Sequence, residues 1–270
     1  MRVPHTIAVA QDLLPYHPVG DETALFEFAY RQRLPVAIKG PTGCGKTRFV
    51  RHMAQRLGRP LLTVACHDDL TAADLVGRHL IGADGATVWH DGPLTRAVRA
   101  GGICYLDEVV EARKDTTVIL HPLADDRRQL PLDRTGELLD APPEFMLVVS
   151  YNPGYQNMMK GMKPSTRQRF VSLRFGFPPP AVEQAVLVGE TGIDAHWAAR
   201  LVTLGNALRA LGDVDLDEGV GTRLLIHAAR LIQGGFPPLA ACRSALAEAL
   251  SDDDETVAAL LEVIHAHLGT

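Results

Sequence analysis

Apolar residues in the first two thirds of the chain gather into short continuous runs, and the segments between most of these runs have helical spacing. Continuous apolar runs are typical of strands that are covered on both faces of a parallel sheet. We expect strands at residues 35–38, 61–65, 145–150 and 170–175, and a further strand that ends at Asp107. The pattern therefore predicts an α/β fold, a parallel sheet with helices on both faces.

The pattern changes after a proline-rich stretch at residues 176–180, which we interpret as a stiff extended connector. Beyond it there is no convincing strand, and apolar residues recur at helical spacing. They are Trp197, Leu201, Leu204 and Leu208, then Leu224, Leu225, Ala228 and Leu231, and finally Leu260, Leu261, Ile264 and Leu268. We expect an α/β domain at 1–176 and a small all-helical lid at 177–270.

Two segments interrupt the alternation of strand and helix with the pattern of short hairpins. One covers residues 79–89 around a turn at 82–85, and the other covers 129–139 around a turn at 134–136. Surface hairpins inserted in such a domain usually contact another molecule, although a decorative insertion is the alternative. Before the first strand, Asp21 is the expected N-cap of a helix.

A glycine-rich run between the first predicted strand and the helix that follows predicts a phosphate-binding loop. It consists of Gly40, Pro41, Thr42, Gly43, Cys44, Gly45, Lys46 and Thr47. Its glycines let successive backbone N–H groups face one anion, and the helix start adds a positive dipole end. We expect Lys46 to reach the β- and γ-phosphates and the Thr47 hydroxyl to bind Mg²⁺. The chain should therefore bind a nucleoside triphosphate.

Two carboxylates, Asp107 and Glu108, follow the third predicted strand and form a Walker B pattern. Ligands of parallel sheets lie beyond the carboxyl ends of the strands, so we expect Asp107 near Mg²⁺. Glu108 is then placed to polarise the water that attacks the γ-phosphorus. An isolated Asp-Glu pair would more simply be a solvated turn, and the apolar strand before this one favours the functional interpretation.

Three further residues are candidates for reading the γ-phosphate. Asn152 follows the fourth strand and can hold the attacking water or a phosphate oxygen, although Asn before Pro is also a common turn former. Arg167 and Arg169 precede the last strand. We expect them at the far edge of the sheet from the phosphate loop, where they suit the nucleotide of a neighbouring subunit better than their own.

Composition narrows the choice of partners. The 270 residues carry a net charge of −5, which argues against a main role in binding nucleic acid. No signal segment or membrane-length apolar run is present, so we expect a cytoplasmic protein. The cysteines Cys44, Cys66, Cys104 and Cys242 have no metal-type spacing and should be core thiols. Cys44 is the exception to watch, because a thiolate at a helix N-terminus is favoured.

Taken together, these motifs resemble AAA+ ATPases of the MoxR branch, and within it the CbbQ/NorQ family. The resemblance covers nearly the whole chain. It is carried by ACHDDL at 65–70, DLVGR at 74–78, DGPLTRA at 91–97, LDEVVEAR at 106–113, SYNPGY at 150–155 and STRQRF at 165–170.

The resemblance implies roles for single residues. Asn152 matches sensor 1, Arg169 with Arg167 matches the arginine finger, and Arg223 matches sensor 2 at the start of a lid helix. The two hairpins match inserts that face the pore of a ring.

The resemblance also implies ATP with Mg²⁺, a homo-hexamer, and a CbbO-like partner with a von Willebrand factor A domain. It favours a CbbQ-type activase that releases inhibitory sugar phosphates from Rubisco. A NorQ-type role in maturing nitric oxide reductase is the alternative. The chemistry of no single residue distinguishes between these two roles. Association with carboxysomes cannot be read from the residues.

Three other classes of function are weighed against an ATP-driven motor that remodels a client enzyme, the class to which both of these roles belong. A P-loop phosphotransferase would need an acceptor pocket and a mobile arginine-rich flap, whereas a packed bundle is predicted here. A binding scaffold, in which ATP only fixes the shape of a ring, conflicts with the presence of Glu108. A GTPase is disfavoured because the sequence has no Asn-Lys-x-Asp run for guanine.

Overall fold

A computed structural model describes residues 14–153, 162–211 and 219–269. The chain divides into two compact units, which we treat separately. The first contains the described parts of 1–14, 20–39 and 47–174, and the second contains those of 15–19, 40–46 and 175–270. The domain boundary at residue 176 stays a prediction, and in the structure the phosphate loop groups with the helical unit.

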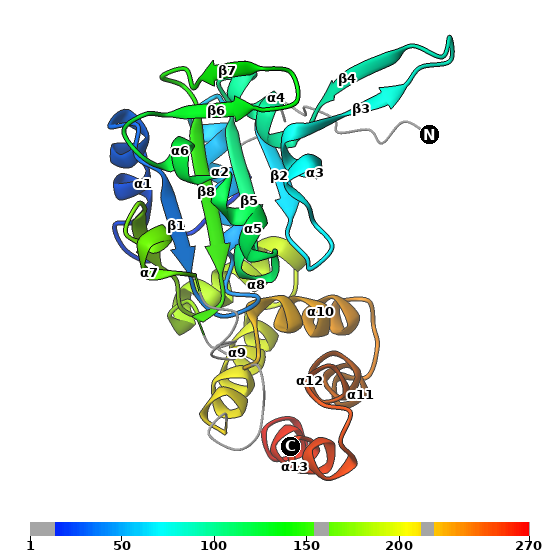
Figure 1. Cartoon of the computed structure of the whole chain (residues 1–270). Helices are drawn as coiled ribbons and strands as arrows, with labels where there is room; N and C mark the ends of the chain where they lie inside the picture. The colour runs from blue at the N-terminus through cyan, green and yellow to red at the C-terminus, as the bar shows by residue number, and fades with distance from the viewer. Residues whose placement is uncertain (1–13, 154–161, 212–218, 270) are drawn as a thin grey trace. The chain divides into compact units, whose positions relative to one another are not determined.

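The first unit is built on a five-stranded parallel sheet of order β2-β5-β8-β1-β9 (Figure 1). Its strands are β1 (Val36–Lys39), β2 (Leu61–Ala65), β5 (Ile103–Asp107), β8 (Met146–Tyr151) and β9 (Val171–Arg174). All six residues of β8 are buried, as expected of a strand covered on both faces. The five predicted strands are confirmed.

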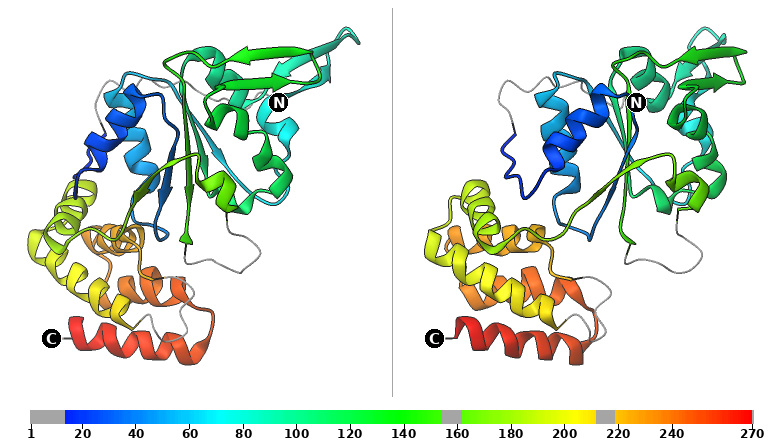
Figure 2. Two further views of the ribbon diagram at one scale, coloured as in Figure 1. Left: turned by 60° about the vertical axis from the view of Figure 1, so that its left-hand side comes forward. Right: turned by 90° about the vertical axis from the view of Figure 1, so that its left-hand side faces the viewer.

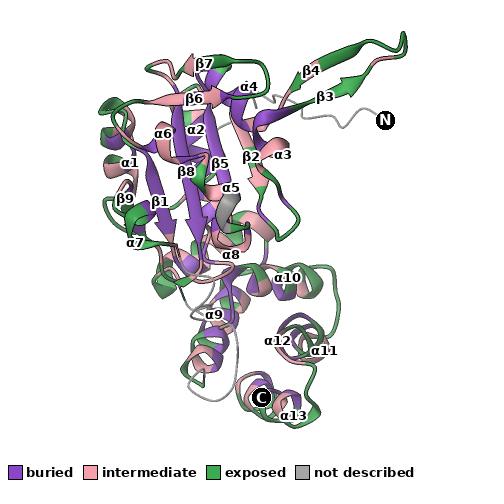
Figure 3. Cartoon of the chain, in the orientation of Figure 1, coloured by how far each residue is buried: buried purple, intermediate pink, exposed green. Residues whose placement is uncertain are grey.

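Helices cover both faces of this sheet. The helices of the unit are α1 (Glu22–Arg31), α2 (Lys46–Arg56), α3 (Ala72–Val76), α4 (Pro93–Ala100), η1 (Val109–Glu111), α5 (Lys114–Val118), α6 (His121–Ala124) and α7 (Pro164–Arg167). Figure 2 shows α1 and α2 on one face and α5 and α6 on the other. The buried rings of Phe26 and Phe49 join α1 to α2 edge to face, with centroids 5.4 Å apart. The buried middle of the sheet appears in purple in Figure 3.

Both predicted hairpins are present in the first unit. Strands β3 (Gly77–Ile81) and β4 (Thr87–Asp91) form one, and β6 (Gln129–Leu132) and β7 (Glu137–Asp140) form the other. The β3–β4 hairpin extends away from the sheet, as Figure 1 shows. Its apolar side chains Leu80, Ile81 and Val88 are exposed.

Asp21 is the N-cap residue of α1, as expected, but its side chain makes no capping hydrogen bond. The Glu22 carboxylate instead accepts a hydrogen bond from the Gly20 N–H at 2.8 Å. A carboxylate in the first turn also favours the positive end of the helix dipole.

The second unit is helical beyond its N-terminal loops. Its elements are α8 (Pro180–Thr191), α9 (Ala195–Ala210), α10 (Thr222–Gln233), α11 (Pro238–Cys242), the π-helical η3 (Arg243–Ala247), α12 (Glu248–Leu250) and α13 (Asp254–Leu268). The predicted stripes form its core, except that Leu231 is exposed. Pro180, which we placed in the connector, is the first residue of α8, because proline suits the first helical position.

A buried ion pair joins three helices of the second unit. Glu183 on α8 is fully buried and accepts two hydrogen bonds from the Arg209 guanidinium on α9, at 2.8 and 2.6 Å. The Thr222 hydroxyl at the start of α10 donates to the same carboxylate at 2.6 Å. Because a buried charge is costly unless it is paired, this network fixes where α10 begins.

The four cysteines are buried thiols, as expected. Within the described ranges, no helix combines the length and the apolar character needed to cross a bilayer.

Candidate functional site

The phosphate loop folds back on the side chain that should bind phosphate. The Lys46 side chain is buried, and its Nζ donates to the carbonyl oxygens of Gly40 at 2.9 Å and Pro41 at 3.2 Å. The loop turns at Gly43 and Gly45, whose φ angles are +74° and +99°. A Cβ added at Gly45 would meet no atom within 4 Å, so the loop leaves open space there.

The start of α10 packs directly against this loop within the second unit. A Cβ on Gly43 would lie 3.1 Å from the Cα of Gly221 and 3.6 Å from the Cβ of Arg223. A Cβ on Gly221 would lie 2.9 Å from the carbonyl oxygen of Thr42. Glycine is therefore needed on both sides of the contact. The exposed Arg223, our expected sensor 2, begins its helix beside the loop.

The predicted metal-binding pair is assembled in the first unit. Thr47 lies in the first turn of α2, and Asp107 is the last residue of β5. The Thr47 Oγ1 donates to Asp107 Oδ2 at 3.0 Å. Hydroxyl and carboxylate oxygens are the ligand types that Mg²⁺ accepts.

Two further hydroxyls surround the same carboxylate. Tyr105 OH donates to Asp107 Oδ1 at 2.7 Å, and Ser150 Oγ donates to that atom at 2.6 Å. Tyr105 and Asp107 are two residues apart on β5 and so share a face of the sheet. Ser150 lies on the neighbouring β8, whose register with β5 pairs Leu106 with Val149. Continuing that register by one residue sets Ser150 opposite Asp107.

Burial and the nearby Asp107 charge raise the pKa of Tyr105 far above its ordinary value. The phenol therefore stays protonated and remains a donor to the carboxylate. Burial, together with the charges of Asp107 and Glu108, raises the pKa of the Cys66 thiol to about 12. The Cys66 thiol therefore stays protonated beside the carboxylates.

Glu108 has an unusual backbone conformation. Its φ and ψ of 53° and 51° lie in the left-handed region. For a residue with a side chain this costs about 1–2 kcal/mol. The conformation ends the strand and starts η1, and the Glu108 N–H donates to Ser150 Oγ at 3.2 Å. Residues held in strained conformations cluster at functional sites.

The three remaining candidates of the first unit lie at two ends of the sheet. Asn152 is partly buried and directly follows β8, so it shares the carboxyl edge with Asp107. Arg167 is exposed at the end of α7, and the partly buried Arg169 precedes β9. An Arg169 Nη1 donates to the Ser165 carbonyl oxygen, and its buried Nε has no hydrogen-bond partner. Residues 154 and 155 of the SYNPGY string lie outside the described residues.

Our expectation that the arginines lie at the far edge of the sheet from the loop needs correction. Strand β9 is an edge strand, but its neighbour is β1, which leads into the phosphate loop. The separation runs along the strands instead. Val171 pairs with Val36 at the start of β1, so Arg169 precedes the amino end, whereas the loop follows the carboxyl end.

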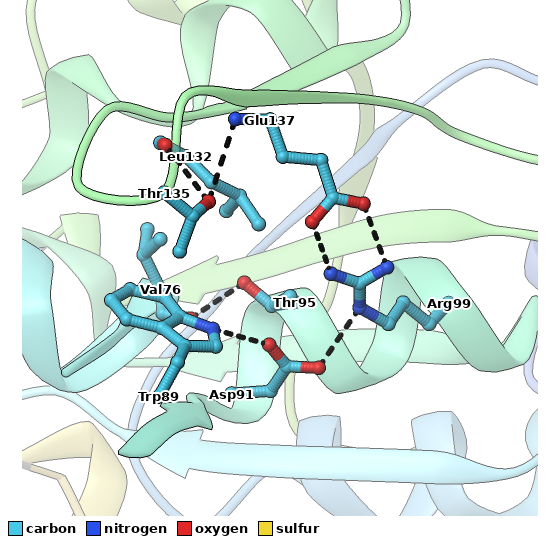
Figure 4. A network of polar contacts seen from close by, with 8 residues as sticks. All are labelled: Val76, Trp89, Asp91, Thr95, Arg99, Leu132, Thr135 and Glu137. Carbon is cyan, nitrogen blue, oxygen red and sulfur yellow. Dashed lines mark hydrogen bonds and ion pairs between the residues drawn. The ribbon is translucent and has the colours of Figure 1, made fainter. Parts of the chain in front are cut away.

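A second polar network joins the two hairpins through α4 (Figure 4). Arg99 donates from Nε to Asp91 at 2.9 Å and makes two bonds to Glu137 at 2.9 and 2.6 Å. Asp91 ends β4 and also accepts from the Trp89 indole at 2.7 Å. Hydrogen bonding from Arg99 lowers the pKa of Glu137. The Thr95 hydroxyl anchors the same helix to the Val76 carbonyl oxygen at 2.6 Å.

Sequence reasoning missed Tyr105 and Ser150, because both lie in runs that were interpreted as apolar strands. A signal was available, since a hydroxyl in a fully buried strand needs a hydrogen-bond partner. Gly221 and Arg99 were also missed. Their contacts depend on residues far away in the sequence, and local pattern carries no trace of them.

The residues fit a nucleotide and Mg²⁺. The loop combines open space with a buried ammonium, and the pair of Thr47 and Asp107 supplies two oxygens. No cluster of three or more His, Cys, Asp or Glu is found in the parts of the chain that the structure describes. Mg²⁺ usually takes one or two protein ligands and completes its shell with phosphates and water, and Thr47 and Asp107 can supply two such ligands.

Comparison with known proteins agrees with this geometry. Residues 35–170 match the family described as AAA domain (dynein-related subfamily), and residues 183–267 match CbbQ/NirQ/NorQ C-terminal. A solved structure of a Thermotoga maritima RuvB mutant has a TM-score of 0.55 at 16% identity. The match covers 91% of this chain and 69% of that one, and shows the fold alone.

The matches to three curated relatives cover most of this chain and most of each relative. The denitrification regulatory protein NirQ of Stutzerimonas stutzeri is 65% identical over 98% of this chain and 96% of its own. Protein NorQ of Paracoccus denitrificans is 60% identical over 94% of each chain. Protein CbbQ of Hydrogenophilus thermoluteolus is 56% identical over 89% of this chain and 90% of its own. The chain therefore belongs to the CbbQ/NirQ/NorQ family of AAA ATPases.

Proposed function

We propose that this ATPase is a remodelling motor whose nucleotide site is completed by a second copy of the chain in a homo-hexamer. Lys46 binds the β- and γ-phosphates, while Thr47 and Asp107 hold Mg²⁺. The bound metal neutralises charge that develops on the phosphates. Glu108 takes a proton from the attacking water, Asn152 orients that water, and Arg223 responds to the nucleotide through the lid.

The position of Arg169 carries this proposal. It precedes the amino end of β9, whereas the phosphate loop follows the carboxyl end of the neighbouring β1. The buried Arg169 Nε also has no hydrogen-bond partner. An arginine placed in this way suits a nucleotide held by an adjacent subunit. Arginine fingers contribute about 10³–10⁵ in rate, or roughly 4–7 kcal/mol of barrier.

Replacing Arg169 by Ala tests this assignment. We expect unchanged binding of a fluorescent ATP analogue and a loss of steady-state hydrolysis by about 10³-fold or more. Arg167→Ala is the matched variant, because Arg167 is an exposed arginine two residues earlier. A smaller loss is expected there. Full hydrolysis by an Arg169→Ala oligomer would reject the finger assignment.

The client is the finer part of the proposal. NirQ, which is named a denitrification regulatory protein, is 65% identical to this chain, NorQ is 60% identical, and the CbbQ relative is 56% identical. This order favours a client in denitrification, and we propose maturation of nitric oxide reductase with a CbbO-like partner that carries a von Willebrand factor A domain. The proposal involves neither a membrane-spanning segment of this chain nor binding to nucleic acid.

The second candidate is a CbbQ-type activase of Rubisco, which the match to CbbQ over 89% of this chain supports. A cytoplasmic location belongs to both candidates, and association with carboxysomes belongs to the second. The test is reconstitution with each client, the partner protein and ATP. Glu108→Gln serves as the control without hydrolysis. Activation of one client and not the other decides between them.

A further inference from the structure

Ser150 contacts both Asp107 and Glu108, the two carboxylate residues that follow one another at the end of β5. It is fully buried on β8, and its Oγ takes part in three contacts. It donates to Asp107 Oδ1 at 2.6 Å, lies 3.0 Å from the Tyr105 hydroxyl, and accepts from the Glu108 N–H at 3.2 Å. One hydroxyl group therefore contacts the side chain of Asp107 and the backbone of Glu108 at once.

The count of hydrogens gives each hydroxyl a definite task. Tyr105, Ser150 and Thr47 each have one hydrogen to donate. Directed at Asp107, these hydrogens place two donors on Oδ1 and one on Oδ2. Oδ1 is thus held from the sheet side by Tyr105 and Ser150. Oδ2 faces the start of α2, where Thr47 lies.

As a hydrogen-bond acceptor, Ser150 contacts Glu108, whose backbone is in the left-handed conformation. In that conformation the Glu108 N–H donates to a side chain of β8. The direction in which the Glu108 side chain leaves the backbone follows from its φ and ψ. A substitution at Ser150 should therefore change the positions of both carboxylates.

We propose that Ser150, assisted by Tyr105, is a positioning residue that holds Asp107 and Glu108 as one rigid unit for metal binding and water activation. This inference rests on the proposed function, in which Thr47 and Asp107 bind Mg²⁺. Ser150 touches neither metal nor nucleotide in this account. Partners that orient a metal ligand typically change metal affinity or activity by about 10–100-fold when they are removed.

The test measures metal binding separately from turnover. Mn²⁺ replaces Mg²⁺ and is titrated by electron paramagnetic resonance against the full-length protein with ADP bound. For Ser150→Ala we expect Mn²⁺ binding to weaken by about 10–100-fold. Metal-free ADP affinity should be unchanged, because Lys46 and the loop are intact. Ser150→Thr keeps the hydroxyl and should restore much of the metal affinity.

Two variants serve as references. Ser172→Ala removes a hydroxyl from the exposed side of β9 and should bind metal like the wild type. Tyr105→Phe removes one of the two donors to Oδ1 and should weaken Mn²⁺ binding less than Ser150→Ala. It also serves as the test if Ser150→Ala does not fold. Wild-type metal affinity in folded Ser150→Ala would overturn the inference. If Ser150→Ala does not fold, wild-type metal affinity in Tyr105→Phe would overturn it.

Asp107→Asn separates this inference from the proposed function. If Asp107→Asn loses Mn²⁺ and Ser150→Ala keeps it, the metal site stands and the role of Ser150 is overturned. If Asp107→Asn itself keeps Mn²⁺ at wild-type affinity, the metal site and the inference fall together.

Discussion

Two polar networks of the first unit use similar groups in different surroundings. Around Asp107, the side chains of Tyr105 and Ser150 are fully buried. In the other network, the Arg99 and Glu137 side chains are each 41% exposed. Both networks satisfy a carboxylate with several donors. They differ in what happens when a donor is removed.

Burial decides the consequence. In the buried network, a lost donor leaves a polar atom without water to replace it, which costs about 1–3 kcal/mol. In the exposed network, water takes the vacated place, and exposed ion pairs contribute little to stability. The buried network is therefore suited to fixing the geometry of a reaction. The exposed one is suited to joining two surface hairpins.

The largest expected contrast comes from the same substitution in both networks. Asp107→Asn should lower ATP hydrolysis by at least about 10²-fold, because it removes the proposed metal ligand, on which three hydroxyls converge. Asp91→Asn should leave ATP hydrolysis by the protein without a client near the wild-type level. The amide oxygen of Asn can still accept one hydrogen bond. Steady-state phosphate release measures both. Equal losses in the two variants would erase the distinction between the networks.

The two networks should also respond to opposite ends of the pH scale. The folded-state pKa of Tyr105 is raised above its ordinary 10.0, so its contribution to stability is present below pH 10 and is lost as pH rises further. The pKa of Glu137 is lowered from 4.5, so its contribution is present above that value and is lost as pH falls.

Urea unfolding across pH measures these contributions. Above pH 10, Tyr105→Phe should lose stability less steeply than the wild type. The comparison also removes the effect of Cys66, Cys104 and Cys242, whose pKa values are raised to about 12 by burial in both proteins. Below pH 4.5, Glu137→Gln should show the shallower dependence. Identical profiles for wild type and variant would contradict the assigned shifts.

The smallest effect is expected from Arg99→Lys. Lysine keeps the charge but cannot form the forked contact with Glu137 while also reaching Asp91. Hydrolysis by the isolated protein and global stability should change little, whereas amide hydrogen exchange in β6 and β7 should become faster. High salt should shrink the difference, because it screens exposed charges. A tenfold loss of hydrolysis would show that the two networks are energetically linked.

Much of the fold could be predicted because its signals are local. Five apolar runs gave the five strands, and alternating patterns gave both hairpins. The phosphate loop and the Asp107-Glu108 pair stand out because their chemistry needs glycine and carboxylate at fixed spacing. The family resemblance extended this to the whole chain, and the comparisons confirm it.

The rest depends on contacts between distant residues. No local pattern reports that β9 pairs with β1, that Gly221 packs on Gly43, or that Arg99 joins two hairpins. Ser150 is the instructive case. Its hydroxyl looked like a neutral part of an apolar strand, and only the register of β8 with β5 brings it to Asp107.

Mixed oligomers test the central claim, that a second copy completes the nucleotide site. Glu108→Gln and Arg169→Ala subunits are co-expressed in equal amounts, and ATP hydrolysis is compared with each variant alone. Both pure variants should be inactive. In the mixture, an Arg169→Ala subunit supplies Glu108 and a neighbouring Glu108→Gln subunit supplies Arg169, so about a quarter of the sites should recover. A mixture as inactive as its components would contradict the account.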